Sequence, residues 1–92
     1  MKAIWHNVIL AESDKTKIVE DKHYFPPDSI NSEYFLLSDT HSQSPFGKAS
    51  YFDVQVGDHR KADAALFYPN PDANSSEIKN HVTFLKEIEI KE

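Results

Sequence analysis

Short apolar segments, separated by turn-forming residues, follow one another along the whole chain. Short runs that are rich in β-branched and aromatic residues and are bounded by Asn, Asp, Gly or Pro are typical of strands. The segments predicted as strands are 3–5, 8–12, 17–20, 23–25, 34–37, 49–56, 64–69, 82–85 and 88–90. Because no long helical segment separates them, they predict a mainly β domain with antiparallel pairing.

The clearest alternation lies in segment 49–56. Successive side chains of a strand point to opposite faces of the sheet, so Phe52, Val54 and Val56 are expected to face the core. Tyr51 and Gln55 are expected to face the other way.

Turn chemistry places the connections between these strands. His6-Asn7 predicts a tight hairpin, because Asn tolerates a positive φ. Further turns are expected at Asp21-Lys22 and over residues 57–63 around Gly57, and the polar stretch 38–48 is predicted to be a loop.

Two short helical turns are also expected. The first lies between Asp28 and Glu33, after a proline pair that ends the preceding strand. The second follows Ser75 or Ser76, either of which is a suitable N-cap, and ends at Asn80 in a left-handed conformation.

Length and composition fit one domain, residues 1–92, with its own core. The chain has 92 residues, of which 39% are hydrophobic and 27% charged, without long blocks of like charge. Its formal net charge of −5 provides no basic surface for a phosphate backbone, so we expect no nucleic-acid partner.

The absence of cysteine excludes disulfides, thiolate zinc sites and a cysteine nucleophile within this chain. The apolar runs of the first twelve residues are interrupted by His6 and Asn7, unlike the continuous apolar region of a signal peptide. No segment has the ~18 apolar residues of a membrane span. We therefore expect a cytoplasmic protein without a membrane partner.

The residue types that carry chemistry form no tight motif. No two of the five histidines have the close spacing of metal ligands, so turn or surface positions are favoured and no metal or other cofactor is expected. Ser38, Asp39 and His41 are a nucleophile, a carboxylate and a base, but catalytic triads draw these from separated segments, which favours a turn. Gly47 and Gly57 alone cannot form a Gly-rich phosphate-binding loop. The carboxylates Glu12, Asp39, Asp53 and Asp63 are candidates for acid–base work.

Six blocks, "LAES", "HYFPPDSI", "SDTH", "PFGKASYFDV", "DAALFYPNP" and "EIKNHVTF", occur in the order found in the domain-of-unknown-function family 427. The chain resembles this family from about Ala3 to Glu89. Some domain databases label the family nucleotidyltransferase-like. The resemblance implies a compact antiparallel fold similar to the β-tent domains, to which the residue patterns add the two short helical turns.

The resemblance also implies one cavity lined by the family's polar and aromatic positions. In this chain these positions are Glu12, Ser13, Tyr24, Thr40, Pro45, Lys48, Tyr51, Asp63 and Tyr68. Members often have a cysteine where this chain has Ser44, and a serine needs a strong base to match a thiolate.

Three functional hypotheses follow. In the first, the turn at Ser44 presents backbone N–H groups to a small organic or anionic ligand, and Glu12 and Lys48 form an ion pair inside the ligand pocket. The pocket is lined by Glu12, Tyr24, Thr40, His41, Ser44, Lys48, Tyr51 and Tyr68. In the second, the protein is a hydrolase or transferase in which His41 or Glu12 is the base, and His41 lies within hydrogen-bond reach of Ser44 or Thr40. In the third, an apolar edge at residues 65–68 makes a homodimer.

Overall fold

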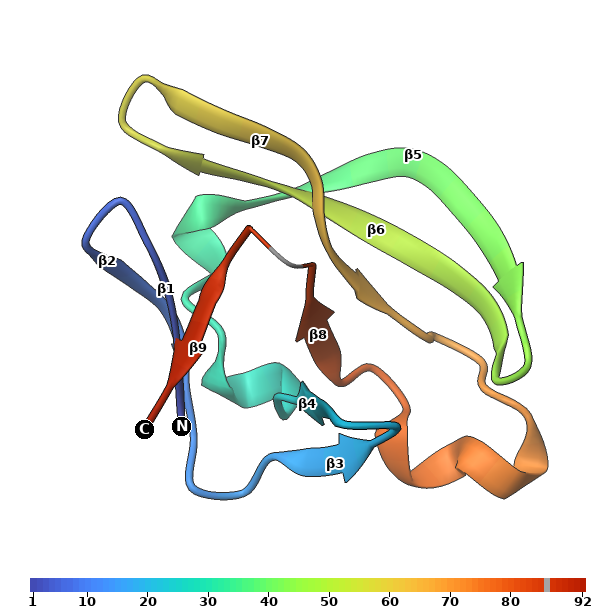
Figure 1. Cartoon of the computed structure of the whole chain (residues 1–92). Coiled ribbons are helices and arrows are strands. Elements are labelled where there is room, and N and C mark those ends of the chain that lie inside the picture. Colours follow the sequence, from blue (N-terminus) through green and yellow to red (C-terminus); the bar gives the residue numbers. More distant parts are fainter. Residues whose placement is uncertain (86) are drawn as a thin grey trace.

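In the computed structural model, which describes residues 1–85 and 87–92, the chain forms nine strands and three short 3-10 helices (Figure 1). The strands are β1 (Lys2–Trp5), β2 (Val8–Glu12), β3 (Lys17–Val19), β4 (Lys22–Tyr24), β5 (Phe35–Ser44), β6 (Gly47–Val56), β7 (His59–Phe67), β8 (Val82–Phe84) and β9 (Glu89–Lys91). The helices are η1 (Pro27–Ser29), η2 (Ser32–Tyr34) and η3 (Ala73–Ile78). The prediction of a mainly β domain is confirmed.

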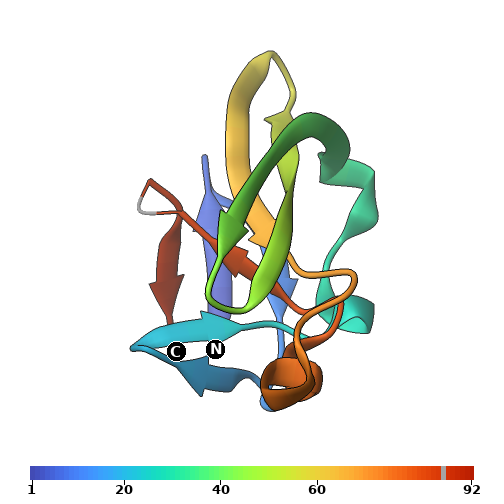
Figure 2. The ribbon, with the colours of Figure 1, turned by 90° about the vertical axis from the view of Figure 1, so that its right-hand side faces the viewer.

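The strands pair antiparallel in three sheets, with the orders β2-β1-β9, β3-β4 and β5-β6-β7-β8. The long strands β5, β6 and β7 arch over the short strand β8, while the other two sheets lie along the opposite side (Figures 1 and 2). Both ends of the chain lie close together, because Lys2 of β1 is opposite Lys91 of β9.

Residues with positive φ make the tight turns. His6 (φ 48°) and Asn7 (φ 63°) join β1 to β2, which confirms the predicted hairpin. Glu20 and Asp21 (φ 51° and 65°) join β3 to β4, one residue earlier than predicted, because Lys22 already pairs with Val19.

The turn at Gly57 is shorter than the sequence indicated. Only Gly57 and Asp58 form it, and β7 begins at His59, so the prediction of a turn through residue 63 is wrong. The polar residues 59–63 belong to a strand because β6 supplies their backbone partners, as in the pair Val56↔His59.

The polar stretch 38–48 is a second correction. Residues 38–44 continue β5 and residues 47 and 48 begin β6, so only Pro45 and Phe46 form the turn. His41 pairs with Ser50, and most of the polar side chains of this part of β5 are exposed. Strand pairing therefore overrides the turn preference of Ser, Asp and Thr.

The main core contains the side chains predicted from the alternation. Val54 is fully buried, and Phe52 and Val56 pack against the same cluster as Leu10, Phe25 and Phe84. A second cluster on the other side of β6 contains Ala49, Leu66, Tyr24, Tyr68 and Ile78, with Tyr51 packed against it. Residues 65–68 were expected to form an exposed apolar edge, and this is wrong, because β7 is an inner strand between β6 and β8 and Ala65, Leu66 and Tyr68 are buried.

The helical turns differ in detail from the prediction. Two turns, η1 and η2, replace the single one expected, because Ile30 between them bridges to Ala11 and Asn31 donates its N–H to Leu10. Asp72, rather than Ser75 or Ser76, caps η3 by accepting the N–H of Asn74. Asn80 has φ 61°, as predicted. In the part of the chain that the structure describes, no helix has the length and apolar character needed to cross a membrane.

Candidate functional site

A groove of about 580 Å³ runs between the bulged middle of β7, the end of β8 and the β3–β4 hairpin. It is lined by Lys22, Lys61, Ala62, Asp63, Phe84, Leu85 and Glu87. A neighbouring hollow of about 190 Å³ shares Lys22, Phe84 and Leu85 with it. The volume of the groove lies in the range of roughly 300–1,000 Å³ that is usual for small-molecule sites.

The lining combines an apolar floor with charged walls. Phe84 is 7% exposed and Leu85 is half-buried, so both present apolar surface that the core does not fully cover. Lys61 Nζ lies 2.8 Å from Glu87 Oε1, and this ion pair joins β7 to the segment after β8. Lys22 forms no ion pair with any residue that the structure describes.

Two irregularities in the large sheet shape the wall of the groove that contains Asp63. Residues 38–40 of β5 lie opposite the single residue Tyr51, and residues 62–64 of β7 lie opposite the single residue Asp53. Extra residues of this kind bend a strand and re-aim its side chains. Because Tyr51 and Asp53 are close neighbours on β6, the extra residues of β5 and β7 meet across it.

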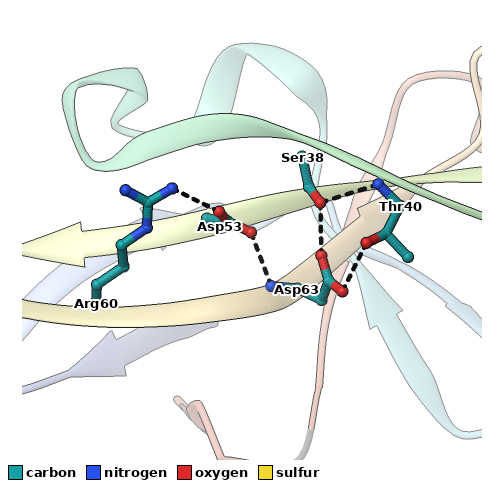
Figure 3. A network of polar contacts seen from close by, with 5 residues as sticks. All are labelled: Ser38, Thr40, Asp53, Arg60 and Asp63. Carbon is teal, nitrogen blue, oxygen red and sulfur yellow. Dashed lines mark hydrogen bonds and ion pairs between the residues drawn. The ribbon is translucent and has the colours of Figure 1, made fainter.

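The carboxylate of Asp63 holds the two bulges together (Figure 3). Ser38 Oγ donates to Oδ1 at 2.6 Å, and Thr40 Oγ1 donates to Oδ2 at 2.8 Å. Ser38 Oγ also accepts the backbone N–H of Thr40 at 3.1 Å. Both carboxylate oxygens of Asp63 are therefore used within the protein.

A second carboxylate fixes the backbone of the β7 bulge. Asp63 has φ 53°, a left-handed conformation that Asp tolerates better than most residues. Its N–H donates to Asp53 Oδ1 at 2.9 Å, and Arg60 donates to Asp53 Oδ2 at 2.8 Å (Figure 3). The hydrogen bond from Arg60, followed by that from the Asp63 N–H, lowers the pKa of Asp53 below its ordinary value.

Three of the predicted site residues lie together, but within a structural cluster. Ser44 Oγ donates to Tyr68 Oη at 3.1 Å, and the rings of Tyr68 and Tyr24 are 6.5 Å apart. Tyr24 is 3% exposed, and burial, reinforced by Tyr68, raises its pKa to about 12. Ser44 Oγ also accepts the N–H of Phe46, so the turn uses this N–H itself rather than offering it to a ligand.

The other predicted site residues are dispersed. Glu12 Oε2 lies 3.9 Å from Lys2 Nζ in the β1–β2 hairpin. The predicted ion pair between Glu12 and Lys48 is therefore wrong: Glu12 pairs with Lys2, and Lys48 belongs to the sheet that contains β6. His41 is exposed and its Nδ1 lies 3.3 Å from Ser50 Oγ, so its side-chain hydrogen-bond partner is Ser50 rather than Ser44 or Thr40.

Tyr51 and Thr40 have polar partners of their own. Tyr51 Oη lies 2.9 Å from Ser42 Oγ, and Thr40 is bonded to Asp63. Neither residue lines the groove, nor do the other six predicted site residues. Thr40 is connected to the groove only through Asp63.

Most residues that line the groove had no signal in the sequence. Asp63 was among the candidate carboxylates, but Lys22, Lys61 and Glu87 are ordinary charged residues, and Phe84 belongs to a segment predicted as a strand. Among the described residues, no group of three or more His, Cys, Asp or Glu side chains could hold a metal ion. The lining of the groove thus combines apolar side chains with two lysines and two carboxylates.

Comparisons with known proteins place the chain in a family without assigning an activity. None of the curated proteins matches it. A family model described as a domain of unknown function, DUF427, and carrying the short name NTP_transf_9, matches residues 1–91. Since this match extends over almost the whole chain, the protein belongs to the DUF427 family.

Proposed function

We propose that this domain binds a small organic ligand in the groove between β7, β8 and the β3–β4 hairpin. The observation that carries the proposal is a groove whose lining combines the apolar side chains of Phe84 and Leu85 with the lysines Lys22 and Lys61. Binding sites for small molecules combine apolar lining with a few polar groups that fix orientation.

The polar network of Asp63 supports this role by holding one wall of the groove. Ser38 and Thr40 donate to its carboxylate. Its backbone N–H donates to Asp53, which Arg60 in turn holds. Because these contacts are made within the protein, they hold the wall in place, and a wall held in this way requires less ordering on binding.

The enzyme hypothesis requires a predicted base next to a predicted hydroxyl nucleophile, and the structure does not bring these residues together. It needed His41 beside Ser44 or Thr40, and His41 is instead exposed and bonded to Ser50. The carboxylate of Glu12 lies in another sheet, near Lys2. We therefore propose ligand binding alone.

Titration with a neutral probe, followed by amide chemical shifts, tests the proposal. We expect 4-phenylbutyramide to cause saturable shifts at Ala62, Phe84 and Leu85, because its phenyl group fits the apolar floor. Ala62→Tyr should abolish these shifts, since Ala62 is exposed and a larger side chain there fills the groove. Gln55→Tyr, an exposed position of β6 outside the groove, is the matched control.

Saturable shifts that are lost in Ala62→Tyr and kept in Gln55→Tyr support the proposal. An absence of saturable shifts in the wild-type protein contradicts it. Shifts centred on Tyr24 and Tyr68 also contradict it, because they would place the ligand at the buried tyrosine cluster instead.

A further inference from the structure

The ion pair between Lys61 and Glu87 occupies one wall of the groove. The two side chains are 33% and 56% exposed, and they come from β7 and from the segment that follows β8. Since the pair is open to solvent, its two partners can separate at low cost. Lys61 can therefore exchange one carboxylate for another.

The remaining charges of the groove favour an anionic ligand. Lys22 lines the same groove and is exposed, without an ion pair among the residues that the structure describes. Asp63, the other acidic residue of the lining, directs its carboxylate to the hydroxyls of Ser38 and Thr40 on β5 (Figure 3). A ligand anion can thus approach two ammonium groups, with Glu87 as the carboxylate that it must replace.

Building on the proposed function, we infer that the ligand is a small carboxylic acid with an apolar body, and that Glu87 is its built-in competitor. Lys61 Nζ donates a hydrogen bond to Glu87 Oε1 at a distance of 2.8 Å. The ligand carboxylate takes the place of Glu87 while its apolar body covers Phe84 and Leu85.

Two probes that differ only in charge test this inference, namely 4-phenylbutyrate and its amide. Wild-type protein should bind the acid more tightly than the amide, and this preference should fall at high ionic strength because solvent-exposed charges are screened. Glu87→Gln removes the competitor and should tighten acid binding about two- to fivefold, the range expected for one exposed ion pair, while amide binding stays unchanged. Lys61→Gln should remove most of the preference for the acid.

Two exposed residues outside the groove provide matched controls. Glu33→Gln and Lys48→Gln change the net charge by the same amounts as Glu87→Gln and Lys61→Gln. We expect neither control to alter the ratio of acid to amide affinity. A change as large in the controls would assign the effect to net charge and overturn the inference.

The remaining outcomes separate this inference from the proposed function. If the amide binds in the groove and the acid binds no better, the inference is overturned and ligand binding stands. If the acid is preferred but Glu87→Gln has no effect, the competitor role of Glu87 is overturned. If neither probe binds, both proposals are contradicted.

Discussion

Replacing Asp63 with alanine tests whether its carboxylate and backbone conformation stabilise the bulge of β7. The substitution removes the acceptor of Ser38 at 2.6 Å and of Thr40 at 2.8 Å, and it leaves alanine at φ 53°. Hydrogen bonds to charged groups contribute about 1.5–3 kcal/mol each. Because Thr40 is exposed and Ser38 only half-buried, we expect about 2 kcal/mol for the two bonds together.

The left-handed backbone distinguishes alanine from glycine at this position. An L-residue with a Cβ costs roughly 1 kcal/mol or more in this conformation, and Asp63 and its alanine replacement share this cost. Asp63→Ala should thus lower the free energy of unfolding by about 2 kcal/mol, through the lost hydrogen bonds alone. Asp63→Gly loses the same hydrogen bonds but relieves the backbone, and it should be about 1 kcal/mol more stable than Asp63→Ala.

Urea unfolding followed by the fluorescence of Trp5, the single tryptophan, measures these differences. Asp39→Ala is the matched control, because Asp39 is an exposed carboxylate in the same region of β5. Equal stability of the Ala and Gly variants would refute the contribution from the left-handed backbone. A loss below ~0.5 kcal/mol in Asp63→Ala, the usual range for surface substitutions, would refute the role of the hydrogen bonds.

Four further predictions concern the pH dependence of stability and the backbone conformation of glycines. The pKa of Asp53 is lower in the folded protein than in the unfolded chain, so its ionised carboxylate stabilises the fold above the unfolded pKa, and this stabilisation is lost as the pH falls through the folded pKa. Arg60→Gln removes the main cause of the lowered pKa. Urea unfolding should therefore show this variant less stable than wild type at neutral pH and equally stable in acid. Burial, reinforced by Tyr68, raises the pKa of Tyr24 from 10.0 to about 12. The stabilisation of the fold by the neutral phenol is therefore lost as the pH rises between these two values. Tyr24→Phe should make the stability, measured by circular dichroism, less dependent on pH in this alkaline range. Gly47→Ala should cost about 1–3 kcal/mol in thermal or urea unfolding, because residue 47 has φ 120° and an added Cβ would lie 3.2 Å from a backbone carbonyl. Gly57→Ala, at φ 58° with open space around it, should cost only about 1 kcal/mol.

Local patterns predicted the parts of the fold that depend on local physics. Alternation identified Phe52, Val54 and Val56 as core residues, because every second side chain of a strand points to the same face, whichever strand lies next to it. Asn7 and Asn80 were correctly placed in left-handed conformations, since Asn tolerates a positive φ independently of distant contacts.

The polar half of β5 could not be predicted in the same way. Ser38 and Thr40 are typical of turns because their hydroxyls can bond to nearby backbone groups. Here the hydroxyls donate to Asp63, more than twenty residues away in the sequence, and β6 provides the backbone partners of β5. The same chemistry thus serves a long-range contact, which no local pattern can reveal.

The groove was unpredictable because three distant segments form it and because a bulge decides where their charges point. In a regular strand Lys61 and Asp63 would share one face, and their opposite charges would neutralise each other. The left-handed residue at Asp63 interrupts this alternation, so that its carboxylate meets Ser38 and Thr40 while Lys61 meets Glu87. The bulge therefore directs the carboxylate of Asp63 to Ser38 and Thr40 and leaves Lys61 to pair with Glu87, the partner that we propose a ligand anion replaces.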